Sequence, residues 1–134
     1  MSQANVQIVR RVLEHYLATD ELLGELFAPT FVWDMSTFRD WPEQQFYEGV
    51  EGLRTFLRGW TAVFDGWEIE LDAFHDAGET VVDIGVQRGR PNLTGGPPVE
   101  AVFAHVWTLR DNLLRRAEVY ADPAEALKAV GLEG

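Results

Sequence analysis

The sequence predicts an α+β fold: a cone-like, curved and mostly antiparallel sheet wrapped around three helices near the N-terminus, with a short C-terminal helix. Three observations support this class. Apolar residues recur at helical spacing in much of the first half, the period changes to two after Gly66, and the later strands are joined by turns, whereas parallel strands need long crossovers. At 134 residues the chain predicts a single domain, residues 1–134, large enough to bury a core.

The first segment predicts two helices. Apolar residues at helical spacing between Val6 and Leu17 indicate the first helix. A short second helix is expected over residues 22–27, because leucines and a phenylalanine follow suitable capping residues there and Pro29 would end it.

The next segment predicts a strand, a loop and a third helix. Residues 31–36, FVWDMS, contain the β-branched and aromatic residues that strands favour. Residues 37–49 combine Pro42 with polar and aromatic residues, which predicts a loop able to cover other parts of the fold. The apolar stripe from Leu53 to Phe64 indicates an amphipathic helix that buries one face.

The second half predicts four antiparallel strands. In the first of them Trp67, Ile69 and Leu71 alternate with acidic residues, so we expect these three to be buried and Glu68 and Glu70 to be exposed. The others are VVDIGVQ, VEAVFAHVWTLR and LLRRAEVY, separated by a Gly- and Pro-rich connection and by the turn RDN.

The closing segment predicts a short helix. Asp122 and Pro123 suit its cap and its first position, and Gly131 suits its end.

Charge and composition exclude several classes of partner. Lys and Arg number 11 against 22 Asp and Glu, and the resulting net charge of -11 would repel the phosphate backbone of nucleic acid. No apolar run approaches the roughly 20 residues of a membrane span, and the start does not resemble a signal peptide, so we expect a cytoplasmic protein without membrane contact. Without cysteines or histidines at ligand spacing, we expect no metal site and no cofactor.

The curvature of the sheet predicts an internal apolar cavity, because three helices cannot fill a cone completely. Aromatic residues at regular spacing either line such a cavity or simply pack in the core. The candidates for the lining are Tyr16, Trp33, Trp60, Phe64, Phe103 and Trp107.

Three stretches carry a family resemblance: LATDELLGELFAPTFVWDMS, YEGVEGLRTFLRGW and HVWTLRDN…YADPAEALKAVGL. With the order of the elements, they resemble the SnoaL-like branch of the nuclear transport factor 2-like superfamily, which includes ketosteroid isomerase. This resemblance covers nearly the whole chain. It implies a pocket between the concave sheet face and the helices, and homodimers formed through the outer sheet face. Since the superfold hosts enzymes, binders and scaffolds, function has to be argued from the site.

Two polar residues form the candidate catalytic pair. Asp34 is a carboxylate within an apolar strand, and its position resembles that of the general-base aspartate of ketosteroid isomerase. His105 shares a strand face with Phe103 and Trp107 and resembles that enzyme's protonated oxyanion-hole aspartate in position. We expect Asp34 to face the pocket as a base and His105 to donate to a substrate oxygen. The alternatives are a strand-end carboxylate bonded to a loop amide and a satisfied core histidine.

The chain departs from the family pattern at two places. Val12 stands where the isomerase has its tyrosine, with Tyr16 one turn later, and Val119 stands where SnoaL-type cyclases have a catalytic acid. The family's activities therefore do not transfer directly. The loop residues Asp40 and Trp41 are either a lid or part of a solvated loop.

The leading functional hypothesis is a small-molecule protein with a deep hydrophobic pocket, of isomerase, cyclase or hydrolase type, that transfers protons on an apolar, oxygen-bearing substrate. The alternatives are a non-catalytic ligand-binding module and a dimeric structural protein whose pocket is filled by side chains. A pocket of several hundred Å³ would separate the first two from the third. We expect a homodimer through the outer sheet face, where Val102 and Val106 lie.

Overall fold

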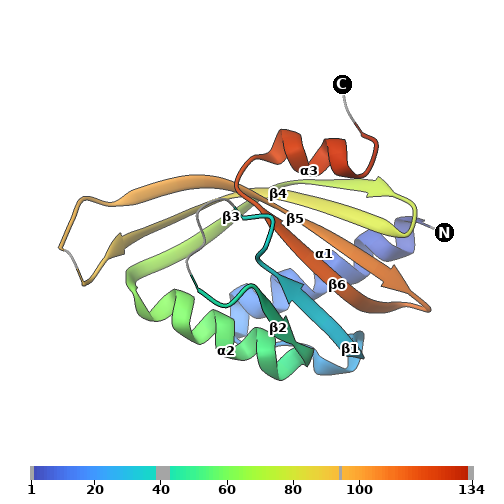
Figure 1. Ribbon diagram of the computed structural model, residues 1–134, viewed down its shortest axis with the longest axis horizontal. Helices are drawn as coiled ribbons and strands as arrows, with labels where there is room; N and C mark the ends of the chain where they lie inside the picture. Colours follow the sequence, from blue (N-terminus) through green and yellow to red (C-terminus); the bar gives the residue numbers. More distant parts are fainter. Residues whose placement is uncertain (1, 39–42, 94, 133–134) are drawn as a thin grey trace.

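Six strands form one curved, unclosed sheet on which three α-helices pack (Figure 1). The computed structural model describes residues 2–38, 43–93 and 95–132. The strand order is β2-β1-β6-β5-β4-β3, in which β1 and β6 are parallel and the other neighbours antiparallel. The mixed, mostly antiparallel sheet confirms the α+β class.

The elements follow the predicted order, apart from the second helix and from the short strand β2, which lies within the predicted loop of residues 37–49. They are α1 (Ser2–Thr19), η1 (Gly24–Leu26), β1 (Phe27–Asp34), β2 (Phe46–Glu48), α2 (Gly49–Ala62), β3 (Phe64–Ala77), β4 (Thr80–Pro91), β5 (Val99–Arg110), β6 (Leu113–Tyr120) and α3 (Pro123–Ala129).

The predicted second helix is wrong. Gly24–Leu26 form a single 3₁₀ turn, and β1 begins directly after it at Phe27. Pro29 does not end a helix; it lies in a part of β1 where the pairing with β6 shifts register. A strand tolerates proline at such an irregularity, because no ladder hydrogen bond needs its missing N–H.

The predicted strands of the second half are confirmed. Trp67, Ile69 and Leu71 are partly buried, while Glu68 and Glu70 are exposed. The turn between β5 and β6 has positive φ at both central residues, Asp111 (55°) and Asn112 (65°). This geometry suits a two-residue hairpin, and aspartate and asparagine tolerate it better than most residues.

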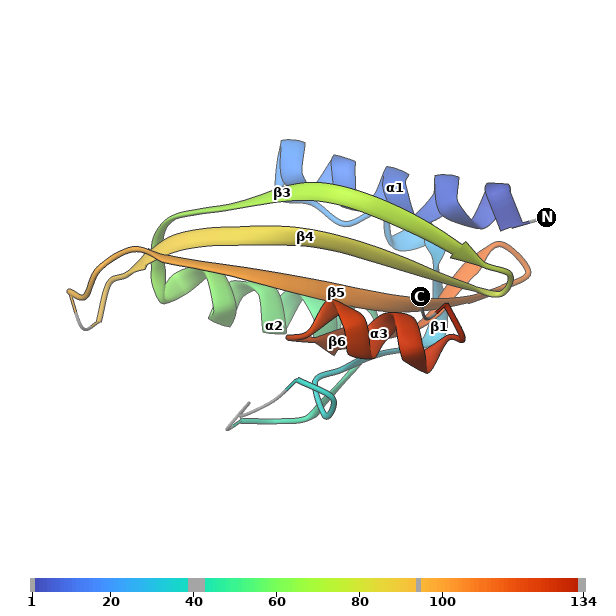
Figure 2. The same ribbon diagram turned by 90° about the horizontal axis from the view of Figure 1, so that it is seen from above.

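Different helices pack on the two faces of the sheet. On the concave face, Val81 and Trp107 belong to the main core, to which α1 and α2 contribute buried residues. On the other face, Val82 and Val106 pack with Ala126 of α3. Figure 2, seen from above, shows α3 in front of the sheet and α2 behind it. The concave face between α1 and α2 is therefore where a cavity can form.

The C-terminal helix has the predicted cap. The Asp122 side chain accepts a hydrogen bond from the backbone N–H of Ala124 (2.9 Å), with Pro123 at the first position. The left-handed φ of Gly131 (79°) follows the helix. Among the described helices, none has the length and apolarity needed to cross a membrane.

Candidate functional site

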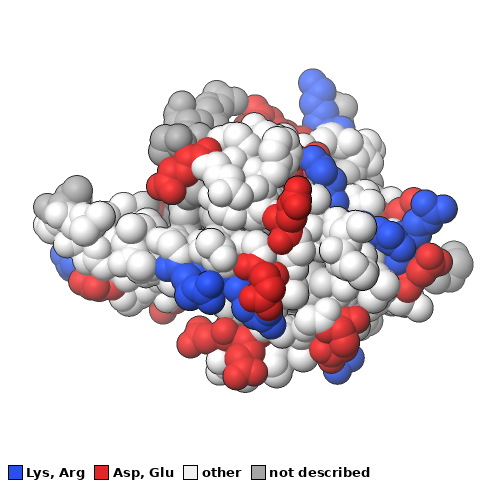
Figure 3. All heavy atoms as spheres, turned by 60° about the horizontal axis from the view of Figure 1, so that its bottom comes forward, with Lys and Arg blue, Asp and Glu red and all other residues white. Residues whose placement is uncertain are grey.

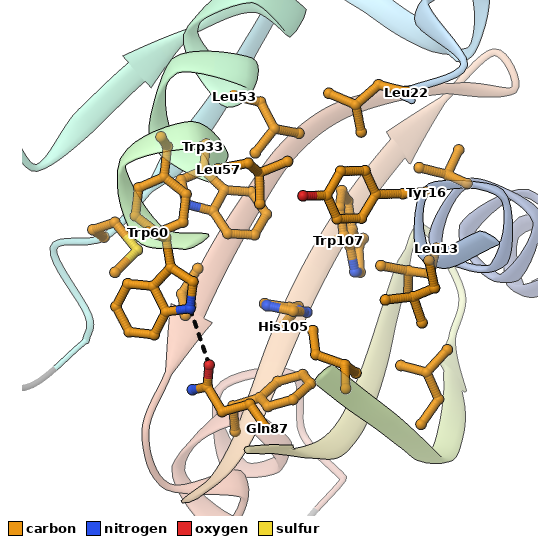
Figure 4. A pocket seen from close by; sticks show the side chains of 18 of the residues that line it. Leu13, Tyr16, Leu22, Trp33, Leu53, Leu57, Trp60, Gln87, His105 and Trp107 are labelled. Atoms are coloured by element: carbon orange, nitrogen blue, oxygen red, sulfur yellow. Dashed lines mark hydrogen bonds between the residues drawn. The ribbon is translucent and has the colours of Figure 1, made fainter. Parts of the chain in front are cut away.

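An apolar cavity of about 80 Å³ lies between α1, α2 and the concave face of the sheet (Figure 4). Its walls come from α1, α2, β1 and β3–β6, and apolar side chains dominate them. The cavity is much smaller than expected for a deep pocket, because large aromatic side chains occupy most of the concave face. Of the predicted lining residues, the cavity contacts Tyr16, Trp33, Trp60, Phe103 and Trp107.

His105 places an imidazole ring at the cavity wall, and a buried carboxylate holds it. Its Nδ1 lies 3.0 Å from Oδ1 of Asp83, on the neighbouring strand β4. The Asp83 side chain is fully buried and also accepts a hydrogen bond from Nε1 of Trp107 (2.5 Å). With the carboxylate as acceptor, Nδ1 carries the hydrogen, and in the neutral imidazole Nε2 then keeps its lone pair. Asp83 therefore fixes both the tautomer and the orientation of the ring.

Gln87 joins two tryptophans at the edge of the cavity. Its side-chain oxygen accepts from the indole N–H of Trp60 (3.2 Å) and from that of Trp67 (3.3 Å). These bonds fix the amide, since its oxygen must face both indoles. The NH₂ group of Gln87 has no protein acceptor in the described part of the chain, which leaves two donors beside the cavity.

Two further donors lie at the cavity wall. The Tyr16 hydroxyl points away from α1 and across the cavity toward α2 (Figure 4). Burial, with a smaller contribution from the charge of Asp20, raises the pKa of Tyr16, so the phenol stays protonated and can donate. The indole N–H of Trp33 is buried without a hydrogen-bond partner among the described residues. The wall is thus rich in donors.

Asp34 lies elsewhere, which corrects the expected pairing with His105. Trp33 faces the cavity, and the next residue of the strand faces the other side of the sheet. There the Asp34 carboxylate, 2% exposed, forms an ion pair with Arg116 and accepts from the N–H of Ser36 (2.8 Å). Asp34 does not line the cavity, and Asp83 takes the role of partner to His105.

The side chains of Asp34, Arg116 and Glu118 form what we call the Asp34 cluster, and its charges predict a stability that depends on pH. The pKa of Glu118 is raised, mainly by burial. The positive charge of Arg116 opposes this shift, and the negative charge of Asp34 adds to it. A raised carboxyl pKa favours the protonated form, so its stabilising contribution is complete below the unfolded-state pKa and is lost as pH rises through the folded-state value. We expect Glu118→Gln, which mimics the protonated form, to stabilise the protein by about 1 kcal/mol or less at pH 7 and by almost nothing near pH 4.

Thermal unfolding at the two pH values measures this difference. Glu68→Gln, at an exposed position of β3, is the matched control and should leave the melting temperature unchanged at both. A Glu118→Gln variant that is less stable than wild type at pH 7 contradicts the electrostatic account of this cluster.

A second, larger space adjoins the cavity. This outer groove, of about 570 Å³, shares Tyr16, Leu22, Leu57 and Trp67 with the cavity lining, so the two spaces meet there. Phe64, predicted for the cavity, lines the groove instead. The predicted lid residues Asp40 and Trp41 lie outside the described residues.

Comparison with protein families connects this site to known proteins. The family model of the SnoaL-like domain matches residues 9–117, which include most of the cavity wall. The chain belongs to the SnoaL-like domain family. No curated protein matches the sequence.

Solved structures share the SnoaL-like fold at low sequence identity. An NTF2-like protein of Burkholderia thailandensis E264 is 27% identical, with a TM-score of 0.74 over 93% of this chain and 95% of that one. TerC, co-crystallised with polyporic acid, is 21% identical, with a TM-score of 0.73 over 95% and 98%. A candidate SnoaL-like polyketide cyclase from Jannaschia sp. CCS1 is 20% identical, with a TM-score of 0.73 over 99% and 95%. The last two show a common fold.

Two residues of this SnoaL-like site escaped the sequence analysis, Asp83 and Gln87. The signal that singled out Asp34, a carboxylate inside an apolar strand, applies equally to Asp83 in VVDIGVQ. Gln87 gave no comparable signal, because a glutamine at the end of a strand is ordinary. In the described residues, no three His, Asp or Glu side chains are grouped as metal ligands.

Proposed function

We propose that this protein binds a small, apolar, oxygen-bearing molecule and transfers a proton at a carbon next to its carbonyl group. The observation that carries the proposal is the orientation of His105, with Nδ1 held by Asp83 and the ring at the wall of an apolar cavity. A neutral imidazole with a free Nε2 is a suitable general base at neutral pH. The proposal assigns the base to His105 in place of Asp34.

In the proposed step, Nε2 of His105 removes a proton from the carbon beside the carbonyl. The C–H electron pair forms a C=C bond while the carbonyl π pair moves to the oxygen, which gives an enolate. The Tyr16 hydroxyl, the Gln87 amide and the Trp33 indole N–H are the donors available among the described residues to stabilise that oxygen. The proton then returns from His105 to the same carbon or to another one of the enolate system, so no further reactant is needed.

The volumes limit how such a ligand lies. The inner cavity of about 80 Å³ is smaller than the roughly 150 Å³ cavity that accommodates benzene in an engineered protein. With the adjoining groove of about 570 Å³, the space reaches the range usual for ligand sites. We therefore propose that the reacting end of the ligand enters the cavity and the remainder lies in the groove. TerC, of the same fold, was co-crystallised with polyporic acid, which favours a ligand-binding role.

The alternative function is a non-catalytic binding module with the same ligand geometry. One experiment separates the two: 4-phenyl-2-butanone is incubated with the protein in D₂O, and proton NMR follows exchange of the protons beside its carbonyl. Exchange faster than in buffer supports the enzyme. Saturable binding without faster exchange supports the binding module, and the absence of both contradicts the ligand-site proposal.

We also propose a homodimer through the part of the outer sheet face that α3 leaves free. Val102 on β5 is 52% exposed there, whereas Val106, also predicted for this interface, is 2% exposed and packs with α3 residues. Light scattering at micromolar concentration should give twice the chain mass of 15.2 kDa, and Val102→Asp should halve the measured mass. A wild-type particle of 15.2 kDa contradicts the dimer.

A further inference from the structure

Positively charged side chains lie at the α2 wall of the outer groove. Leu53 and Leu57 of α2 face the cavity four residues apart, and Arg54 and Arg58 each follow one of them. One residue along a helix turns the side chain by about 100°, so this spacing places both guanidinium groups at the rim of the apolar wall. Both arginines line the groove.

Arg58 differs from Arg54 in having no partner. Arg54 forms an ion pair with Glu51, one turn earlier on α2. Arg58 has no carboxylate partner among the described residues, although acidic residues outnumber basic ones two to one in the chain. Arg88, Arg115 and Arg116 are also paired with carboxylates, whereas Arg11, Arg90 and Arg110 form no ion pair among the described residues; Arg58 differs from these three because it lines the groove.

The surface on the α2 side of the molecule carries charges of both signs. Figure 3 turns the lower side of Figure 1, where α2 lies, toward the viewer and shows basic side chains standing beside acidic ones on a mainly uncharged surface. The groove also contains one carboxylate, Asp20, at the end of α1. Asp20 and Arg58 form no ion pair, so the groove has an anionic and a cationic wall that face the same space.

From this arrangement we infer that the ligand carries an acidic group, a carboxylate or a similar oxyanion, which Arg58 binds in the outer groove while the reacting end enters the cavity beside His105. The inference rests on the proposed function, because it assumes that the cavity and the groove hold one ligand. A guanidinium group suits a planar anion, since two of its N–H groups can donate to the two carboxylate oxygens. Asp20 would repel the same group, so it directs the anion to the α2 wall.

Two ligands that differ in one group test the inference: 4-phenylbutanoate and the neutral 4-phenyl-1-butanol. Calorimetric titration of the full chain should give tighter binding of the carboxylate than of the alcohol. In Arg58→Gln the affinity for 4-phenylbutanoate should fall about 3- to 10-fold and that for the alcohol should not change. In Asp20→Asn the affinity for the carboxylate should rise. Both effects should weaken as salt is raised to about 0.15 M.

Arg11→Gln is the control, because Arg11 is exposed on α1, does not line the groove and changes the net charge in the same way. Equal binding of the acid and the alcohol by wild type overturns the inference and leaves the proposed function intact. Equal weakening of both ligands by Arg58→Gln, or an effect of Arg11→Gln as large as that of Arg58→Gln, overturns it as well. Failure of the alcohol and of 4-phenyl-2-butanone to bind contradicts the proposed function itself.

Discussion

The His105→Gln variant should exchange the protons of 4-phenyl-2-butanone about 10²- to 10⁴-fold more slowly than wild type, the contribution usual for a positioned general base. Glutamine fills similar space and retains a hydrogen-bond donor for Asp83, but its amide is no base at neutral pH. Binding of the ketone should change little, because the apolar wall remains. The rate constant of deuterium incorporation, measured by NMR at saturating ketone, gives the effect directly.

His75→Gln is the matched control. His75 pairs with Val82 across β3 and β4, and Val82 faces α3 rather than the cavity. Its replacement should leave the exchange rate unchanged. Equal rates in wild type and His105→Gln would show that His105 is not the base, even if the ketone binds.

Asp83→Ala should be the most destabilising change at the site, by about 2–4 kcal/mol. It removes the acceptor of two buried donors, Nδ1 of His105 and Nε1 of Trp107, and an unsatisfied buried donor costs about 1–3 kcal/mol. For a chain of this length we expect the melting temperature to fall by roughly 6–20 °C. Calorimetry or circular dichroism measures this fall, with the exposed Asp72→Ala as the control.

Asp83→Asn separates positioning from stability. An asparagine oxygen can still accept from one of the two donors, so the loss of stability should be smaller than in Asp83→Ala. Its NH₂ group, however, can donate to Nδ1 of His105, which favours the tautomer with hydrogen on Nε2. Asp83→Asn should therefore slow the exchange strongly while it lowers the free energy of unfolding only a little. An Asp83→Ala variant as stable as Asp72→Ala would contradict the burial argument.

Local signals in the sequence predicted most of the fold. The alternation around Trp67, the turn RDN and the Asp122 cap each depend on a few neighbouring residues, and all three were confirmed. The prediction of a helix over residues 22–27 was wrong. The spacing of the leucines there is typical of a helix, but Phe27 pairs with β6 and therefore belongs to a strand. Tertiary pairing overrode a weak local preference.

The site was predicted less completely, because it depends on register between strands. Trp33 and Asp34 are adjacent in β1, and side chains of a strand alternate, so only one of them can face the cavity. The pairing of Asp83 with His105 requires the alignment of β4 with β5, which a 7-residue connection between the strands does not fix. His105 itself was recognisable from the alternation of its own strand.

The central claim is that Asp83 holds His105 with Nε2 free at the cavity. Long-range proton–nitrogen NMR of the uniformly ¹⁵N-labelled protein at pH about 8 tests it, with the His105 signals assigned by their loss in His105→Gln. We expect the hydrogen on Nδ1, an unprotonated Nε2, and a shift of the Nε2 signal when 4-phenyl-2-butanone is added. A hydrogen on Nε2 in the wild-type protein, or an Nε2 signal unmoved by saturating ketone, would contradict the account.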